Sequence, residues 1–245
     1  MTEKTIAFFD LDETLISINS GTSWMQREKK LGRINNWHMV QGGLMLAFYK
    51  FGVIDIEAAF TKALATIKDL DESDIEAQTR EWFFEDVTKY ACPGAWQFLE
   101  AHRAADHKLV LLTSSSPYAG ASAAEFFKLD AALTSKYETE NGKFTGKPVI
   151  PLCYGAGKIH YAEKYAEENG CSLEQAYFYT DSNTDLPMLE AVAYPRVVHP
   201  DPRLQISCLM RGWPVLNWKQ DSLGPIEQKL LREVHDSSDK IANAD

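Results

Sequence analysis

Cysteine is scarce in this chain of 245 residues, and none of its four cysteines stands in a Cys-x-x-Cys pair. They are widely scattered, at Cys92, Cys153, Cys171 and Cys208. This spacing indicates neither a zinc site nor a disulfide framework. Reduced thiols are therefore expected, and they suit a cytoplasmic protein.

Excess positive charge and long apolar runs are also missing. Lys and Arg number 25 against 35 Asp and Glu, so the net charge is −10 at pH 7. Such a chain is poorly suited to nucleic acid, although a local cation or metal can still attract a phosphorylated ligand. The N-terminus lacks the apolar stretch of a signal peptide. Residues 34–49 have no charged side chain, but they fall short of the ~18–20 apolar residues of a membrane span. We expect a buried helix there, with a membrane-contacting surface as the alternative.

What the chain does contain is an alternation of short apolar runs and helical patterns. Hydrophobic residues make up 45%, enough for a sizeable core. Runs typical of strands buried on both faces occur at residues 4–9, 108–113, 175–179, 196–198 and 214–216. Helical patterns lie between them, at residues 118–127, 159–168, 186–192 and from Pro93 onward. This order predicts an α/β fold with a Rossmann-like parallel sheet. Within it, Asn141-Gly142 indicates a hairpin.

Residues 17–91 differ, because they show helical patterning without a clear strand. About 75 residues is too long for a loop, so we expect a small α-helical cap domain. Asp55 is predicted to cap one of its helices, and Ser73 with Glu76 fits a capping box at another. The predicted organisation is an α/β core (1–16 and 92–218), a helical cap (17–91) and a polar C-terminal tail (219–245). The tail is expected to be helical over 223–234 and frayed from 236 onward.

Acidic side chains follow the first predicted strand, where Asp10 and Asp12 stand two residues apart. Ligands of open α/β sheets bind beyond the carboxyl ends of the strands. Two such close carboxylates bind a cation between them, or one of them becomes protonated near neutral pH. An ionised Asp10 can attack phosphorus, and Asp12 can protonate a leaving oxygen and then activate water. An acidic surface turn is the alternative interpretation.

Three further polar clusters lie at or near strand ends. Thr113 and Ser114 offer donors for a phosphoryl oxygen, or they simply cap a helix. Lys158 follows Gly-Ala-Gly, whose glycines would let the backbone approach a ligand, and it supplies a positive charge. Asp181 and Asp185 flank a turn into a helix, where they can hold Mg²⁺ or cap the helix. The four clusters together are more specific than any one of them.

Taken in order, these motifs resemble the four motifs of the haloacid dehalogenase-like superfamily. A helical insert after the first motif is similar to the phosphoserine phosphatase-like branch. Residues 181–190, 200–204 and 211–215 resemble bacterial phosphoserine phosphatase-like or histidinol-phosphatase hydrolases. The resemblance extends over residues 5–216 and is weakest in the cap.

The resemblance implies a role for each motif residue. Asp10 would be the nucleophile and a Mg²⁺ ligand, and Asp12 the general acid/base with its carbonyl on the metal. Thr113, Ser114 and Lys158 would hold the phosphoryl group. Asp181 would be the second carboxylate ligand of Mg²⁺, supported by Asp185. Because members that cleave carbon–halogen bonds lack an acid at the place of Asp12, a phosphatase or phosphotransferase is expected.

The resemblance is incomplete at three positions. Glu13 replaces a small residue, Thr184 stands where phosphoserine phosphatases usually have Asn, and Asn19 replaces a Glu that receives the substrate ammonium. Asn19 can accept a hydrogen bond but supplies no charge. Substrate choice is expected to lie in the cap, whose candidate lining residues are Trp24, Arg27, Trp37, His38, Gln41, Met45 and Tyr49.

The expected function is that of a Mg²⁺-dependent phosphatase that hydrolyses a small phosphorylated metabolite, such as phosphoserine or histidinol phosphate, through an aspartyl-phosphate. Transfer to an alcohol, a lipid-phosphate substrate and a non-catalytic phosphate-binding protein are the alternatives. The sequence predicts neither nucleic-acid binding nor a membrane span, and it leaves the oligomeric state open.

Overall fold

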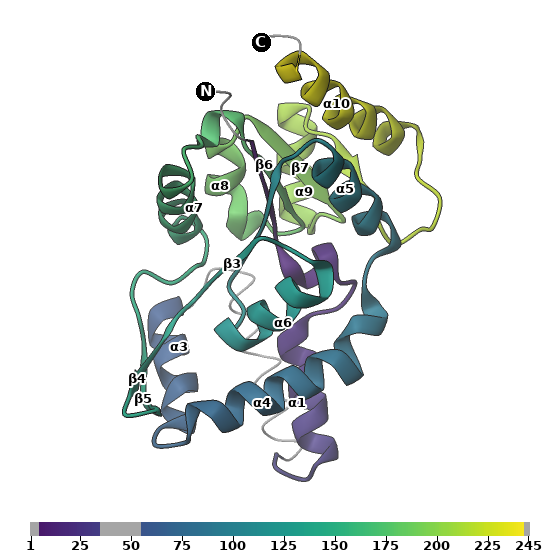
Figure 1. The fold of residues 1–245 in the computed structure, drawn as a ribbon. Helices are drawn as coiled ribbons and strands as arrows, with labels where there is room; N and C mark the ends of the chain where they lie inside the picture. The colour runs from purple at the N-terminus through teal and green to yellow at the C-terminus, as the bar shows by residue number, and fades with distance from the viewer. Residues whose placement is uncertain (1–4, 35–54, 243–245) are drawn as a thin grey trace.

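A six-stranded parallel sheet forms the centre of the computed structural model, which describes residues 5–34 and 55–242. Its strand order is β3-β2-β1-β6-β7-β8, and every neighbouring pair is parallel. The strands are β1 (Ile6–Phe9), β2 (Lys108–Thr113), β3 (Ala131–Thr134), β6 (Tyr177–Thr180), β7 (Tyr194–Val198) and β8 (Val215–Leu216). The predicted α/β fold with a Rossmann-like parallel sheet is therefore confirmed (Figure 1).

Helices cover both faces of the sheet because alternate side chains of each strand point to opposite sides. In β1, Ile6 and Phe8 join one buried cluster, and Ala7 and Phe9 join the other. The first cluster contains residues of α7 (Gly157–Glu168), α8 (Leu186–Ala191) and α9 (Pro202–Arg211). The second contains residues of α5 (Pro93–Ala104), α6 (Pro117–Phe127) and α10 (Pro225–Ala242). Burial on both faces explains why these strands are continuous apolar runs.

The direction in which successive strands are added to the sheet reverses between β1 and β6, although all strands are parallel. From β1 it proceeds to β2 and β3, and then it crosses to β6 on the other side of β1. The register pairs Phe9 with Tyr179, and the Asp10 N–H donates to the Tyr179 carbonyl at 2.9 Å. The turns that follow β1 and β6 therefore lie side by side at this switch point, the usual place for a ligand in such sheets.

The described part of residues 17–91 is helical. It contains α1 (Ser20–Lys30), α3 (Ile56–Leu64), α4 (Glu72–Trp82) and short helical turns, and these helices lie below the sheet in Figure 1. Asp55 caps α3 as predicted, because its side chain accepts from the N–H groups of Glu57 and Ala58. The boundaries of core, cap and tail stay predictions.

The capping box expected at Ser73 is wrong. Helix α4 begins at Glu72, and Asp71 is its N-cap residue without a side-chain capping bond. The reason is tertiary, since the Glu72 N–H donates to the Gly142 carbonyl at 2.8 Å. This carbonyl belongs to the turn of a hairpin formed by β4 (Tyr137–Glu140) and β5 (Lys143–Pro148). The Asn141-Gly142 turn signal was correct, but the hairpin forms its own two-stranded sheet beside α3 (Figure 1).

Three further elements differ from expectation. The edge strand β3 and helix α9 were not predicted from the sequence, since β3 is a four-residue Ala-Ala-Leu-Thr segment and α9 is short. Helix α10 continues to Ala242, well past the end expected at residue 234. Its Leu230 and Val234 are buried against the core cluster that contains residues of α5, so the polar tail has an apolar stripe.

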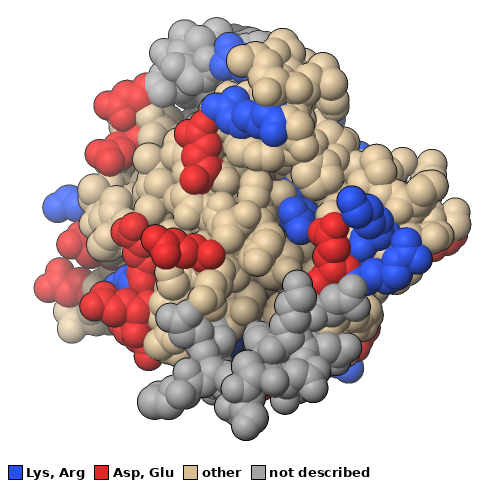
Figure 2. Space-filling model, turned by 90° about the horizontal axis from the view of Figure 1, so that it is seen from above, with Lys and Arg blue, Asp and Glu red and all other residues tan. Residues whose placement is uncertain are grey.

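Charge is unevenly distributed over the surface. Figure 2 shows acidic side chains gathered on the left of one face, while the basic ones form smaller separate groups. Within residues 5–34 and 55–242, none of the helices combines the length and the apolar character that a bilayer crossing needs. The expectation that nucleic acid is not a partner stays a prediction.

Candidate active site

The turn after β1 carries the two carboxylates that the sequence singled out. Asp10 and Asp12 both have extended backbone angles, whereas Glu13 has a positive φ of 54°. The turn is closed by a 3.0 Å hydrogen bond from the Ile16 N–H to the Leu11 carbonyl. Asp10 is 7% exposed and lies at the switch point beside β6. Strand and turn together hold both side chains at one end of the sheet.

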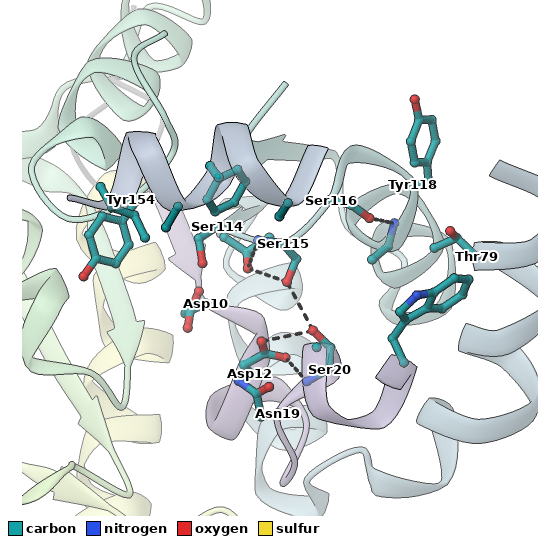
Figure 3. Close-up of a pocket in the computed structure, with 18 of the residues that line it drawn as sticks. Asp10, Asp12, Asn19, Ser20, Thr79, Ser114, Ser115, Ser116, Tyr118 and Tyr154 are labelled. Atoms are coloured by element: carbon teal, nitrogen blue, oxygen red, sulfur yellow. Dashed lines mark hydrogen bonds between the residues drawn. The ribbon is translucent and has the colours of Figure 1, made fainter. Parts of the chain in front are cut away.

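Asp12 is held by the first residue of α1. The Ser20 N–H donates to Asp12 Oδ1 at 2.8 Å, and the Ser20 hydroxyl donates to Oδ2 at 3.0 Å. The first N–H groups of a helix have no partner within the helix, so Ser20 has an amide available for this contact. Ser20 Oγ also lies 3.4 Å from Ser115 Oγ, to which Thr113 Oγ1 donates at 3.3 Å (Figure 3). Hydroxyl groups thus connect the turns after β1 and β2.

Ser114 faces the nucleophile predicted from the sequence. In Figure 3 its side chain points toward the carboxylate of Asp10. Thr113 is buried, and its hydroxyl also accepts from the Ser115 N–H at 3.3 Å. The expected pair therefore lies at the site, and Ser115 joins it. Ser20 and Ser115 were not predicted as contributors to the site, although the Ser-rich segment after β2 is a visible signal for Ser115.

Lys158 is the buried cation of the site. Its ammonium donates to Asp10 Oδ1 at 3.0 Å and to Asp185 Oδ2 at 2.7 Å, and the residue is 2% exposed. Thr180 Oγ1 donates to the same Asp185 oxygen at 2.7 Å. Such an arrangement satisfies buried charges through paired, charge-assisted hydrogen bonds.

The glycine before Lys158 has a structural reason that differs from the one expected. A Cβ at Gly157 would lie 2.1 Å from the Leu152 carbonyl oxygen. The close approach is therefore to the chain itself, rather than to a ligand. It lets α7 begin close to the segment before it, and so places Lys158 over the end of the sheet.

Burial and neighbouring charge raise the pKa values of both aspartates, so both become weaker acids. Burial, and then the charge of Asp185, raise the pKa of Asp10 to about 6, even though Lys158 acts in the opposite direction. Burial, and then the charge of Asp10, raise the pKa of Asp12 to about 7, even though Ser20 donates to it. The same surroundings raise the pKa of Lys158, because the charges of Asp10 and Asp185 outweigh its burial. Lys158 is thus a fixed cation, whereas Asp12 can change its protonation near neutral pH.

The site has an excess of buried negative charge that suits a divalent cation. Asp10, Asp12, Asp181 and Asp185 line one cavity in which Lys158 is the one cation among the described lining residues, and Asp181 is only 6% exposed. Within the described ranges, no group of three His, Cys, Asp or Glu side chains has the spacing of a metal centre. Mg²⁺ needs no such group, since it keeps several waters and takes one or two carboxylates. The residues present therefore fit Mg²⁺, and the assignment of Asp10 and Asp181 as its carboxylate ligands stays a prediction.

The four clusters line one cavity of about 650 Å³ that extends from the sheet to the cap. Its catalytic end contains Asp10, Asp12, Asn19, Thr113, Ser114, Lys158, Asp181 and Asp185, so all the predicted site residues meet there. Tyr154 and Ser116 also line it and were not predicted. The volume is within the ~300–1,000 Å³ typical of small-molecule sites.

Two cap residues that were expected to contact the substrate, Asn19 and Arg27, form hydrogen bonds or ion pairs within the protein. Asn19 is the N-cap of α1, and its amide oxygen already accepts from the Thr22 N–H at 2.9 Å and the Thr22 hydroxyl at 3.1 Å. Arg27 does not line the cavity, because its guanidinium forms ion pairs with Glu81, Glu85 and Asp86. Trp24 lines the cavity as expected, whereas Trp37, His38, Gln41, Met45 and Tyr49 lie outside the described residues.

A family model described as haloacid dehalogenase-like hydrolase matches residues 7–190. The chain belongs to this family. A curated relative, histidinol-phosphatase of Neisseria meningitidis serogroup C (strain 8013), is 28% identical over 88% of this chain and 100% of its own length. Phosphoserine phosphatase SerB1 of Mycobacterium tuberculosis (strain ATCC 25618 / H37Rv) is 28% identical over 87% of this chain and 70% of its own. This haloacid dehalogenase-like protein is therefore an enzyme, a phosphoric monoester hydrolase.

Solved structures support the same fold. A Bordetella pertussis Tohama I protein described as having unknown function matches with a TM-score of 0.79 at 25% identity, over 87% of this chain and 98% of that one. A phosphoserine phosphatase in the form of a phospho-aspartyl intermediate analogue matches with a TM-score of 0.67 at 17% identity, over 94% of this chain and 99% of that one. The likeness in fold thus extends over most of the chain.

Proposed function

We propose that this enzyme hydrolyses a small phosphomonoester, of the size of phosphoserine or histidinol phosphate, through a phosphoryl group carried on Asp10. The observation that carries the proposal is the contact of Lys158 with Asp10 at 3.0 Å, at a strand end where Asp12 stands two residues further on. Phosphoryl transfer depends on positioning and charge stabilisation, and this site offers both.

In the first step, Asp10 attacks phosphorus, while the alcohol oxygen of the substrate leaves with a proton from Asp12. A pKa of about 7 leaves Asp12 partly protonated at neutral pH, as this step requires. Lys158, together with the donors of Thr113 and Ser114, would hold the phosphoryl oxygens. In the second step Asp12, now ionised, takes a proton from water, which attacks phosphorus and releases phosphate from Asp10.

Mg²⁺ would be held by the carboxylates of Asp10 and Asp181, where it would offset the negative charge that the substrate adds to four carboxylates. Asp185 is better placed as a support than as a ligand, because one of its oxygens already accepts from Lys158 and Thr180. We also propose a cytoplasmic location, where reducing conditions would keep the thiols of the four cysteines reduced.

The test is hydrolysis of para-nitrophenyl phosphate with and without Mg²⁺. We expect turnover that EDTA abolishes and Mg²⁺ restores, and that the Asp10→Asn variant loses. Equal turnover by this variant and the wild-type enzyme would overturn the mechanism, and turnover after complete chelation would overturn the metal assignment. Replacing part of the water with an alcohol acceptor, and measuring phosphate against new ester, separates hydrolysis from phosphotransfer.

A further inference from the structure

The cavity has two chemically different ends. Its charged lining residues, within the described part of the chain, come from the turns after β1 and β6 and from the start of α7. The opposite end is formed by α1, α3, the helical turn Ala65–Ile67, α4 and the start of α6. Most of its side chains are aliphatic or aromatic, apart from the hydroxyl-bearing Thr66 and Thr79. The apolar ones include Trp24, Met25, Ile56, Phe60, Leu64 and Ile67. A phosphoryl group held at the catalytic end would therefore direct its alcohol part toward an apolar wall.

Several polar atoms on this wall have partners within the protein, among them the Thr66 hydroxyl, which donates to the Ala63 carbonyl at 2.6 Å. The Tyr118 hydroxyl donates to the Glu72 carboxylate at 2.9 Å, and in Figure 3 it points away from the catalytic aspartates. The Trp82 indole N–H donates to Ser23 Oγ at 3.3 Å. These rings consequently offer the cavity their carbon surfaces, while their hydrogen-bonding groups stabilise contacts among cap and core helices.

Asn19 does not offer the substrate a free hydrogen-bond acceptor through its amide oxygen. Its amide oxygen, the group able to accept from an ammonium, accepts two hydrogen bonds from Thr22. A substrate ammonium or carboxylate lying against the wall would lose its hydration without gaining a charged partner there, because the described charged lining residues, Glu13 among them, belong to the other end. A hydrocarbon chain or ring would instead be stabilised by leaving water.

We infer that the alcohol part of the substrate is uncharged and largely apolar, either aliphatic or aromatic. The inference rests on the proposed function and narrows it. The phosphoryl group is recognised by Lys158 and the strand-end donors, and the alcohol is selected by the cap wall. Esters whose alcohol carries an ammonium or a carboxylate, such as phosphoserine, are the poorer substrates.

Two phosphate esters that differ by one charged group give the decisive comparison. Phenylpropyl phosphate and phenylalaninol phosphate share ring and chain, but the second adds an ammonium. That ammonium makes its alcohol the better leaving group, so intrinsic reactivity opposes the expected result. With Mg²⁺ present, we expect kcat/KM for phenylpropyl phosphate to be at least about tenfold higher, because the ammonium has no partner on the wall. This measurement needs only the wild-type enzyme.

A variant of the wall tests the cause of that preference. Phe60→Asp places a carboxylate in the cavity lining, and we expect it to reduce the preference at least several-fold by favouring the amino ester. Leu70→Asp is the matched control, since Leu70 belongs to the same cap region but is 46% exposed and does not line the cavity. It should leave the ratio of the two kcat/KM values unchanged.

The outcomes separate the two proposals. If para-nitrophenyl phosphate is hydrolysed in an Asp10-dependent way, while the amino ester is used as well as or better than phenylpropyl phosphate, the inference about the wall is overturned and the proposed function stands. A preference that Leu70→Asp alters as strongly as Phe60→Asp also overturns the inference. If no ester is hydrolysed in an Asp10-dependent way, both proposals are wrong.

Discussion

The ammonium of Lys158 lies 2.7 Å from Asp185 Oδ2 while it also contacts Asp10, and all three side chains are buried. Asp185 therefore fixes the position of Lys158, and Lys158 fixes the orientation of Asp10. A buried ion pair of this kind contributes little net stability, but removing one member leaves an unpaired charge. We therefore expect Lys158 to affect both the stability and the activity of the enzyme.

Replacing Lys158 by alanine tests this dependence. We expect kcat/KM for para-nitrophenyl phosphate to fall by roughly 100-fold or more, because the proposed donor to the phosphoryl oxygens is lost. The free energy of unfolding at pH 8 without metal should fall by about 3–5 kcal/mol, because two carboxylates become unpaired. Urea unfolding and steady-state kinetics measure the two effects. Lys164→Ala, on the exposed side of the same helix, is the control. An active, stable Lys158→Ala enzyme would contradict the assigned role.

Ser20 is predicted to position Asp12. Its hydroxyl donates to the Asp12 carboxylate at 3.0 Å and so lowers the pKa of Asp12 against the larger effect of burial. In Ser20→Ala that pKa rises, so the alkaline limb of the kcat/KM profile, measured at saturating Mg²⁺, should move to higher pH. We expect kcat to fall roughly tenfold, as for loss of a hydrogen bond to a charged group.

Two variants distinguish positioning from general damage. Ser20→Thr keeps the hydroxyl and should restore the wild-type pH profile. Ser17→Ala removes a hydroxyl that donates to the Tyr90 carbonyl outside the cavity, so its profile should stay unchanged. If Ser20→Ala lowers kcat but leaves the limb in place, Ser20 acts on the fold rather than on Asp12.

The core and the catalytic end could be predicted from sequence because the signals there are local. A buried strand is a continuous apolar run, and the residue after it lies at the edge where ligands bind. Asp10 and Asp181 follow directly from that rule, and Thr113 is the last residue of its strand. Edge strand β3 lacks such a run, and its first three residues are only partly buried.

Contacts between segments that are distant in the chain have no local sequence pattern from which they could be predicted. Helix α4 begins where the Gly142 carbonyl accepts its first N–H, a partner 70 residues away in sequence. Ser20 binds Asp12 only because α1 starts beside the turn, and Arg27 looked like a cavity residue until its carboxylate partners were placed. Tertiary packing therefore decided helix starts and side-chain partners, where local patterns predicted only that helices exist.

Mg²⁺ should stabilise the protein more at pH 8 than at pH 5.5. The folded-state pKa values of Asp10 and Asp12, about 6 and about 7, lie above the ordinary 3.8. Below pH 4 the two groups cost little. Between pH 4 and about 7 the metal-free protein loses stability, because the unfolded chain releases these protons while the folded protein still holds them, and the loss is complete above pH 7, where both acids are ionised. A bound cation removes that repulsion. The melting temperature, measured with and without Mg²⁺ at both pH values, checks this.

Asp10→Asn is the matched variant for the metal prediction. It removes the buried charge, so the metal-free variant should melt at a higher temperature than the metal-free wild-type protein at pH 8. Its melting temperature should also respond less to Mg²⁺. An equal Mg²⁺ response in variant and wild type would show that the stabilising ion binds elsewhere.

A second pH dependence should come from His102 and His107, buried side chains outside the cavity. Their Nδ1 atoms lie 2.8 Å apart, and His102 Nε2 lies 2.8 Å from the Tyr179 hydroxyl. Burial lowers the pKa of His107 to about 4 and that of His102 well below 6.5. Both are therefore neutral when folded and protonated when unfolded below pH 6.5. Stability is full above pH 6.5 and falls as the pH decreases, by about 1.4 kcal/mol per pH unit for each histidine.

Urea unfolding between pH 5 and 7.5, at saturating Mg²⁺, measures that slope. His107→Leu should reduce it by about 1.4 kcal/mol per pH unit, one proton's worth, whatever its effect on absolute stability. His160→Gln replaces an exposed histidine and should leave the slope unchanged. If His107→Leu and His160→Gln give the same slope as the wild-type protein, the buried histidines are not the groups that bind protons on unfolding, and acid sensitivity arises from carboxylates instead.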